Sequence, residues 1–195
     1  MIMKKLLLFI IITLIGLTSF YFLKPVSKIN IQPLGDVSPE YINLVKKSVK
    51  SFYGYDCLVL TKKEITKDML SRIKKRIDAE KALWNNLSFD NILIITEKDI
   101  CYYKNKSKPE YGIFGLASWP GKTCIISTCR LQKNVSYKKT LERLEKVALH
   151  EIGHNLGLDH CVNNKKCMMN DACGTIKQVD NEKVWFCEKC REQLN

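Results

Sequence analysis

All three histidines of this 195-residue chain lie within one stretch, HEIGHNLGLDHC, at residues 150–161. His150 and His154 are four residues apart, so on an α-helix they lie one turn apart on the same face and can bind a single metal ion. Glu151 is turned by about 100° from His150, so its carboxylate can reach a metal-bound water without ligating the metal. This HExxH spacing is typical of zinc hydrolases.

The third histidine, His160, needs a break in the helix before it can join the other two. On a continued helix it would lie about 9 Å further along the axis than His154 and a third of a turn away from it. Gly157 removes this obstacle, because glycine adopts positive φ and can end a helix in a sharp turn. We therefore predict that His150, His154 and His160 bind one zinc ion. An exposed helix that merely carries His and Glu side chains explains neither Gly157 nor His160.

Three imidazole ligands leave the fourth position of a zinc ion open, which is typical of a catalytic site. A water molecule bound there has its pKa lowered to about 7 and can attack a carbonyl group that the zinc polarises. We expect Glu151 to accept the proton of this water and to deliver it to the leaving amine. The pattern therefore predicts zinc-dependent hydrolysis of peptide bonds, with Glu151 as the catalytic residue.

The residues after His160 extend this pattern to a known family. HExxHxxGxxH followed by a methionine is the metzincin signature, and Met169 is placed as the Met-turn residue that packs beneath the metal. Among metzincins the chain resembles the archaemetzincins, because Cys161 directly follows His160 and the segments CMM and CEKC come next, at residues 167–169 and 187–190. The weaker similarities ITEKDI, FGLAS and STCRL extend the resemblance from about residue 90 to the C-terminus.

The resemblance implies an α+β, metzincin-like fold. Such a fold has a small mixed β-sheet with helices, and its active-site helix is followed by an irregular, zinc-bound C-terminal subdomain. The resemblance also implies a peptidase that holds its substrate extended along an edge strand, for which residues 111–118 or 123–128 are the candidates. The motifs do not distinguish an aminopeptidase from an endopeptidase.

The archaemetzincin pattern also implies a second, structural zinc bound by four thiolates, from Cys161, Cys167, Cys187 and Cys190. The CxxC pair at residues 187–190 supports this on chemical grounds, because two cysteine pairs make a closed tetrahedral site. Five residues separate Cys161 from Cys167, one more than in the family pattern, so Cys173 is an alternative to Cys167.

Disulfides or a redox-active CxxC pair compete with the second zinc. The chain has nine cysteines, an odd number, so intramolecular disulfides cannot include all of them. An extracytoplasmic location would favour disulfides, whereas the spacing of the cysteines favours zinc, and with it a total of two zinc ions. No role is assigned to the remaining cysteines, which are Cys57, Cys101, Cys124, Cys129 and Cys173.

An apolar segment lies at the N-terminus. Residues 6–23 carry no charge and are flanked by lysines on both sides. This run predicts a signal anchor or signal peptide over residues 1–24, and its length favours an uncleaved anchor. The membrane is therefore an expected partner. We expect the catalytic domain to be anchored by residues 6–23 and extracytoplasmic, or secreted if the segment is cleaved.

The rest of the chain is long enough for one domain. Residues 25–37 are expected to form a linker or a first short strand, and residues 38–195 the zinc peptidase domain. This domain is expected to divide at Gly157 into an N-terminal subdomain with the active-site helix (38–157) and a Cys-rich C-terminal subdomain (158–195).

Periodicity places the elements within this domain. Apolar residues at helical spacing predict helices that begin after Ser38, Thr66 and Ser136, the second running to about Asn86 and the third carrying the histidines. The apolar run at 91–100 predicts a buried strand, and residues 111–128 predict two strands or a hairpin that turns at residues 119–121.

The chain is basic, with a formal net charge of +12, which predicts attraction to polyanions. No basic motif with interleaved aromatic residues is present, so nucleic acid is not an expected partner. The expected partner is a peptide or protein substrate, and the chain is expected to be a monomer. Two non-enzymatic alternatives remain: a membrane-tethered protein that binds zinc without turnover, and a basic, zinc-stabilised binding module. A binding module gives no chemical reason for Glu151 beside three intact ligands.

Overall fold

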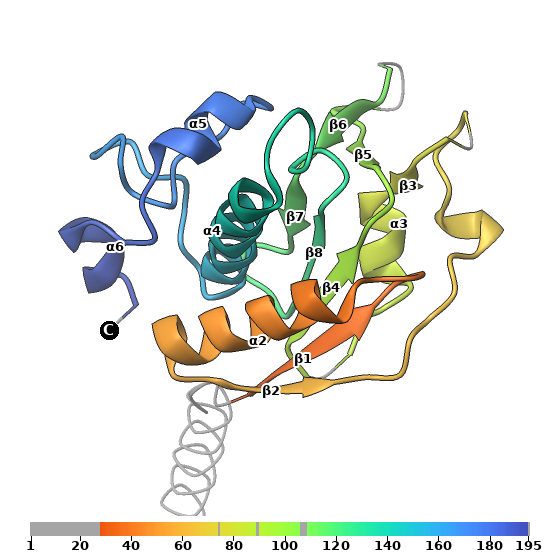
Figure 1. The fold of residues 1–195 in the computed structure, drawn as a ribbon, viewed down its shortest axis with the longest axis horizontal. Helices are drawn as coiled ribbons and strands as arrows, with labels where there is room; N and C mark the ends of the chain where they lie inside the picture. The colour runs from red at the N-terminus through yellow and green to blue at the C-terminus, as the bar shows by residue number, and fades with distance from the viewer. Residues whose placement is uncertain (1–27, 74, 89, 106–108, 195) are drawn as a thin grey trace, which may run out of the picture.

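A computed structural model of the chain describes residues 28–73, 75–88, 90–105 and 109–194 (Figure 1). Its strands are β1 (Lys28–Pro33), β2 (Asp56–Val59), β3 (Ile77–Asp78), β4 (Ile92–Thr96), β5 (Ile100–Tyr102), β6 (Tyr111–Ile113), β7 (Gly115–Ala117) and β8 (Thr123–Ser127). Its helices are α2 (Pro39–Tyr53), the 3-10 helix η1 (Lys67–Met69), α3 (Ala79–Trp84), α4 (Tyr137–Asn155), α5 (Ile176–Asn181) and α6 (Glu188–Glu192).

The strands form two sheets. The larger sheet has the order β2-β1-β4-β8-β7, in which the first four strands are parallel and β7 pairs antiparallel with β8 at the edge. The smaller sheet has the order β3-β5-β6. The predicted α+β fold with a small mixed sheet is confirmed, and so is the predicted hairpin, formed by β7 and β8.

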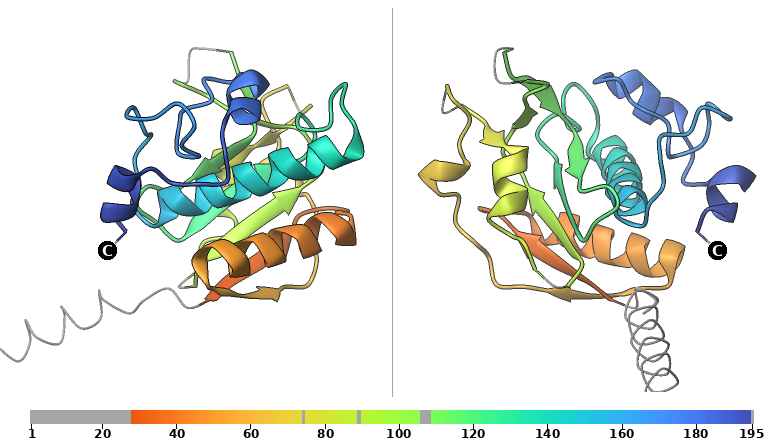
Figure 2. Two further views of the ribbon diagram at one scale, coloured as in Figure 1. Left: turned by 60° about the vertical axis from the view of Figure 1, so that its left-hand side comes forward. Right: turned by 180° about the vertical axis from the view of Figure 1, so that it is seen from behind.

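Helices cover both faces of the larger sheet, because the side chains of β4 alternate between two hydrophobic clusters. Leu93 and Ile95 pack in one cluster with α2 and α4, whereas Ile92 and Ile94 pack in the other with α3. Figures 1 and 2 show α2 and α4 on one side of this sheet and α3 on the other. All five residues of β4 are buried, as its continuous apolar run predicts.

Two of the three predicted helices begin where the sequence places them. The Ser38 side chain caps α2 by accepting a hydrogen bond from the backbone N–H of Glu40, and the helix ends at Gly54 with φ 75°. The Ser136 side chain caps α4 by accepting from the backbone N–H of Lys139. Helix α4 then runs for 19 residues and carries the HExxH motif at its C-terminal end.

The prediction of one helix from Thr66 to about Asn86 is wrong. Only η1 and α3 are helical in this segment, and β3 lies between them. Ile77 in β3 pairs with β5 and is buried, and Asp78 caps α3 through the backbone N–H of Lys81. Burial of Ile77 in the smaller sheet thus overrides the helical spacing of the apolar residues, since local propensity is weak against tertiary packing.

Residues 25–37, predicted as a linker or a first short strand, contain β1. This strand pairs with β2 on one side and with β4 on the other, and its last five residues are buried. Residues 28–33 are therefore part of the sheet and not a linker.

The prediction of a membrane anchor needs correction. Its residues, 6–23, lie outside the described residues, and none of the helices that the structure describes is long and apolar enough to cross a membrane. The membrane is therefore withdrawn as a partner, and the anchored, extracytoplasmic or secreted location that depended on this segment is withdrawn with it.

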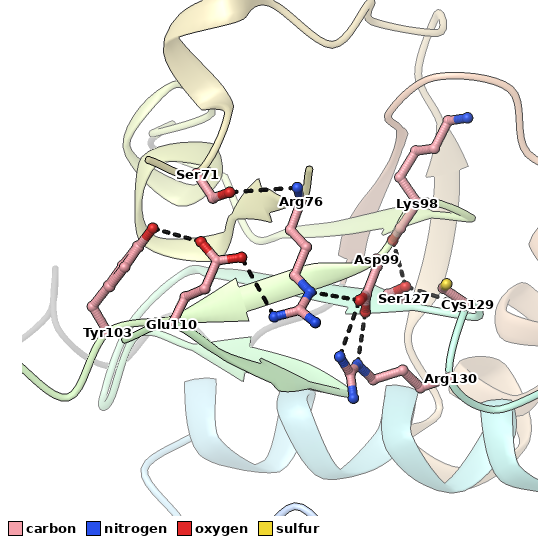
Figure 3. A network of polar contacts seen from close by, with 9 residues as sticks. All are labelled: Ser71, Arg76, Lys98, Asp99, Tyr103, Glu110, Ser127, Cys129 and Arg130. Atoms are coloured by element: carbon pink, nitrogen blue, oxygen red, sulfur yellow. Dashed lines mark hydrogen bonds and ion pairs between the residues drawn. The ribbon is translucent and has the colours of Figure 1, made fainter. Parts of the chain in front are cut away.

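A polar network connects the smaller sheet to the loop before α4 (Figure 3). The Asp99 carboxylate accepts hydrogen bonds from Arg76 Nε at 2.8 Å and from Arg130 Nε and Nη2 at 2.7 and 3.0 Å. Arg76 also pairs with Glu110 at 3.4 Å, and Glu110 accepts from the Tyr103 hydroxyl at 2.7 Å. Because Glu110 directly precedes β6, the network fixes the segment that leads into the edge strand β7.

Loss of the Asp99 carboxylate is expected to lower the free energy of unfolding by about 2 kcal/mol in Asp99→Ala, because two partly buried guanidinium groups would lose their shared acceptor. Urea unfolding followed by circular dichroism measures this change. Asp56→Ala is the matched control, because Asp56 pairs with Lys50 at the surface, where the side chains are 77% and 57% exposed, and its loss should leave the free energy of unfolding nearly unchanged. Equal losses in the two variants would contradict a structural role for the network.

Candidate active site

The three histidines converge at the C-terminal end of α4. Their ring centroids are 4.6 Å (His150 to His154), 4.7 Å (His154 to His160) and 5.5 Å (His150 to His160) apart. The Nε2 atoms of His150 and His154 are 3.0 Å apart. Two nitrogens bound at 2.0–2.1 Å to one tetrahedral zinc would be about 3.3 Å apart. The predicted trio therefore fits a single zinc ion, and the ligand atoms all lie within 4.8 Å of one another.

The helix break lies where the sequence predicts it. Gly157 has φ 97°, and the backbone N–H groups of Gly157 and Leu158 donate to the carbonyls of His154 and Gly153 at 2.9 and 3.0 Å. This is a Schellman-type helix end, in which the left-handed residue reverses the chain direction. The reversal brings His160 back to the other two rings.

Backbone carbonyls orient two of the three rings. Nδ1 of His150 lies 2.7 Å from the carbonyl oxygen of Met168, and Nδ1 of His154 lies 2.7 Å from that of Leu158. If each Nδ1–H donates to its carbonyl, each Nε2 is left as a lone-pair donor, as metal-binding histidines require. Burial lowers the pKa of both rings below the usual value, which favours the same neutral form.

Met169 is fully buried against α4. A Cβ atom on Gly153 would lie 2.6 Å from the Met169 sulfur, so the absence of a side chain at residue 153 lets the sulfur approach the helix backbone next to His154. The carbonyl of Met169 accepts from the backbone N–H of Cys161 at 2.7 Å. Met169 thus packs against the part of α4 that carries the histidines, where a Met-turn residue is expected.

The side chain of Glu151 extends from α4 toward the edge strand β7. Its side chain is buried, and burial raises the pKa of its carboxyl group to about 8. A Cβ atom on Gly115 would lie only 2.4 Å from Glu151 Oε1. The carboxylate is therefore packed against the backbone of β7, in a space that any larger residue at position 115 would fill.

Asn155 is a site residue that the sequence analysis missed. Its backbone carbonyl accepts from the N–H of Gly121 at 3.2 Å. Its side-chain amide faces the carbonyls of Ser118 and Thr123, and with its nitrogen turned toward them it donates to both, at 3.0 and 3.1 Å. Asn155 therefore connects the β7–β8 turn to α4 by hydrogen bonds. Asn155 follows Glu151 by four residues, so the two side chains lie on the same face of the helix, and this spacing could have identified Asn155 from the sequence.

A cavity of about 520 Å³ opens beside the histidines. Residues of β6 and β7 line one side of it, and residues 170–174 and two residues of the α5 region line another. Strand β7 is the last strand of the larger sheet, so its outer edge is not paired with any strand of the described chain. Of the two predicted edge segments, residues 111–118 contain this edge, whereas residues 123–127 form β8, which is paired on both sides.

Four cysteines form a second cluster next to the first. The Sγ atoms of Cys161 and Cys187, of Cys187 and Cys190, and of Cys167 and Cys190 are 3.6, 3.6 and 3.8 Å apart. Sulfur atoms bound at about 2.3 Å to one tetrahedral zinc would be about 3.8 Å apart, whereas a disulfide bond is only about 2.05 Å long. The four buried thiols therefore fit a zinc ion and are not disulfide-bonded.

Cys167, and not Cys173, belongs to this cluster. Cys167 is fully buried within the cluster, whereas Cys173 is exposed and lies in the lining of the cavity. The other cysteines without an assigned role are free thiols too, namely Cys57, Cys101, Cys124 and Cys129.

The two clusters share one loop. Cys161 directly follows His160, and Met168, whose carbonyl lies against the His150 ring, directly follows Cys167. The backbone N–H of Met168 donates to the carbonyl of Trp185 at 2.9 Å, which connects this loop to the segment before the CxxC pair. The cysteine cluster is therefore positioned to hold the loop that orients the histidines.

The sequence and the fold match one family. Residues 41–195 match peptidase family M54. The archaemetzincin of Methanocaldococcus jannaschii is 33% identical over 175 residues, which cover 87% of this chain and 93% of that protein. The archaemetzincin of Halobacterium salinarum is 29% identical over 178 residues, with coverages of 86% and 99%. The crystal structure of the archaemetzincin from Archaeoglobus fulgidus has a TM-score of 0.75 at 28% identity and covers 85% of this chain and 99% of that one.

The chain belongs to the archaemetzincins, peptidase family M54. This membership confirms the resemblance seen in the sequence and makes the chain a zinc metallopeptidase, a hydrolase. The non-enzymatic alternatives are not favoured. A zinc-dependent peptidase from Methanocorpusculum labreanum shares the archaemetzincin fold, with a TM-score of 0.70 at 23% identity.

Adding a methyl group at residue 115 should displace the Glu151 carboxylate. We expect Gly115→Ala to lower peptidase turnover on the order of a hundredfold, because a misplacement of about 1 Å in an active site can have this effect. Turnover is measured on a peptide mixture, together with zinc content and circular dichroism, which should be unchanged.

Gly54→Ala is the control for this substitution. Gly54 has positive φ, unlike Gly115, and an added Cβ there would meet nothing within 4 Å, so the substitution should reduce stability and leave turnover intact. Normal turnover in Gly115→Ala would show that the contact between residue 115 and Glu151 does not matter for the reaction.

Proposed function

We propose that this archaemetzincin hydrolyses peptide bonds at a zinc ion held by His150, His154 and His160, with Glu151 as general base and then general acid. The observation that carries the proposal is the convergence of three imidazoles, two of them oriented by backbone carbonyls, beside a buried carboxylate in one cavity. When bound, zinc acts as a Lewis acid toward the substrate carbonyl and activates water for attack.

Each residue of the site has a distinct part in this reaction. The Glu151 carboxylate takes a proton from the attacking water as the carbon–oxygen bond forms, and delivers it to the nitrogen as the carbon–nitrogen bond breaks. The outer edge of β7, which pairs with no strand among the described residues, holds the substrate backbone extended by hydrogen bonds. Gly157 sets the position of His160, and Met169 supports the helix beneath the histidines as the Met-turn residue.

We also propose a second, structural zinc bound by Cys161, Cys167, Cys187 and Cys190. The Sγ distances of 3.6–3.8 Å and the burial of all four thiols support this site. A four-thiolate site has no open position, so this zinc stabilises the fold and takes no part in the reaction. On this proposal the domain has an N-terminal subdomain that ends at Gly157 and a C-terminal subdomain, residues 158–195, built around the second zinc.

Glu151→Gln is expected to keep both zinc ions and to lose turnover, because the amide preserves the shape of the side chain but cannot take up the proton. Metal analysis and mass spectrometry of a digested peptide mixture measure the two quantities on the same preparations. Glu142→Gln, on the exposed face of the same helix, should retain both. A wild-type protein with two zinc ions that cleaves no peptide in any mixture would refute the proposed function.

The link between the two clusters leads to a separate prediction. Cys190→Ser should lose the second zinc and also lower the occupancy of the histidine site, because the loop that orients His150 and carries Met169 would lose its support. Zinc content per chain and the absorption spectrum of the cobalt-substituted protein distinguish the two sites. Cys173→Ser, which changes an exposed thiol outside the cluster, should retain two zinc ions. Full occupancy of the histidine site in Cys190→Ser would rule out the coupling.

A further inference from the structure

Part of the cavity is lined by residues of α4 and of the α5 region, and we call this part the side-chain chamber. Four of the cavity-lining residues surround it, namely Lys146, Val147, Val179 and Glu182. Lys146 precedes His150 by four residues, so the chamber begins about 6 Å along α4 from the histidines. Lys146 and Glu182 are only 8% and 6% exposed. Charged side chains are rarely buried without a partner, so each needs an explanation.

Docking of α5 onto α4 explains the buried lysine. Lys146 Nζ donates to the carbonyl oxygen of Val179 at 2.8 Å. Beside it, Arg143 forms two hydrogen bonds with the Asp180 carboxylate, at 2.8 and 2.7 Å. Lys146 and Arg143 therefore hold α5 in place as one wall of the chamber.

The docking of α5 does not explain why Glu182 is buried. Among the described residues its side chain has one hydrogen bond, in which Oε1 accepts from Gln178 Nε2 at 3.1 Å, and it forms no ion pair within 4.0 Å. Burial raises the pKa of this carboxyl group to about 7. The charge of Lys146 opposes this shift, but Lys146 lies beyond ion-pair distance, so a buried carboxylate that faces a cavity would gain from a closer cation supplied by a ligand.

The lining of the side-chain chamber points to the same class of ligand. Within the described part of the chain, its one lysine, Lys146, already donates to the Val179 carbonyl, whereas the Glu182 carboxylate has only the Gln178 amide as a hydrogen-bond donor. Val147 and Val179 add apolar side chains to the same lining. A long side chain with an aliphatic stem and a cationic end matches both features.

We propose that the side-chain chamber selects substrates with a lysine or arginine next to the cleaved bond, whose cation pairs with Glu182. The aliphatic stem of the substrate side chain would pack between Val147 and Val179. This inference rests on the proposed peptidase function and adds a substrate class to it. An acidic or amide side chain paired with Lys146 is the rival occupant and an outcome of the test.

The test begins with the purified wild-type chain, its zinc sites loaded, and a peptide library with all residues varied around the cleaved bond. Mass spectrometry of the products should show lysine and arginine enriched at one fixed position. Single peptides with arginine, norleucine or glutamate at that position then give kcat/KM. We expect the arginine peptide to be cleaved best.

Glu182→Gln keeps an acceptor for Gln178 but removes the charge. It should lower kcat/KM for the arginine peptide on the order of ten- to a hundredfold and leave the norleucine peptide unchanged. Glu64→Gln, at an exposed glutamate outside the cavity lining, should change neither peptide. Thermal unfolding and zinc content check that both variants are folded, and the wild-type preference stands as a test even if Glu182→Gln does not fold.

Cleavage by the wild type without a preference for basic residues, or with a preference for glutamate, would overturn this inference and leave the proposed function intact. An equal loss on the arginine and norleucine peptides in Glu182→Gln would also overturn it, because that result indicates a structural role for Glu182. A wild type that cleaves no peptide would overturn the proposed function, and this inference with it.

Discussion

The end of α4 at Gly157 is the constraint on which the rest of the site depends. A continued helix would keep His160 away from His150 and His154, since the rise and the rotation per residue are fixed. The positive φ of Gly157 reverses the chain, and two consequences follow within four residues. The carbonyl of Leu158 comes against the His154 ring, and Cys161 enters the cysteine cluster directly after His160. One backbone conformation thus sets the geometry of both candidate metal sites.

The two clusters depend on each other through main-chain contacts. Residues 161–169 connect the cysteine cluster to the histidines. The carbonyl of Met168 orients the His150 ring, and the carbonyl of Met169 accepts a hydrogen bond from the backbone N–H of Cys161. The loop has little regular structure of its own, so its shape is held by these hydrogen bonds and by the buried thiols. A metal in the cysteine cluster would therefore stabilise the environment of the histidines without contacting the substrate.

The other side of the site is held by the sheet. Strand β7 pairs with β8 inside the larger sheet, and Asn155 connects their turn to α4. The network around Asp99 fixes β6, which leads into β7. It involves Asp99 and Arg130, which lie in the segments ITEKDI and STCRL, so the weak upstream similarities correspond to residues that position the cavity wall. Gly115 in β7 has no side chain, and this leaves space for the Glu151 carboxylate.

The sequence by itself determined the local features. The HExxH spacing, the helix break at Gly157 and the CxxC pair follow from short-range geometry, and so do the Ser caps of α2 and α4, because each depends on residues a few positions apart. Only the tertiary structure decided what depends on distant contacts. It split the helix predicted from Thr66 onward, because Ile77 pairs with β5, and it placed β1 inside the sheet, between β2 and β4. It also placed Cys167 in the cluster, Gly115 against Glu151, and Lys146 beside Glu182 in one cavity, because sequence spacing carries no record of which distant residues pack together.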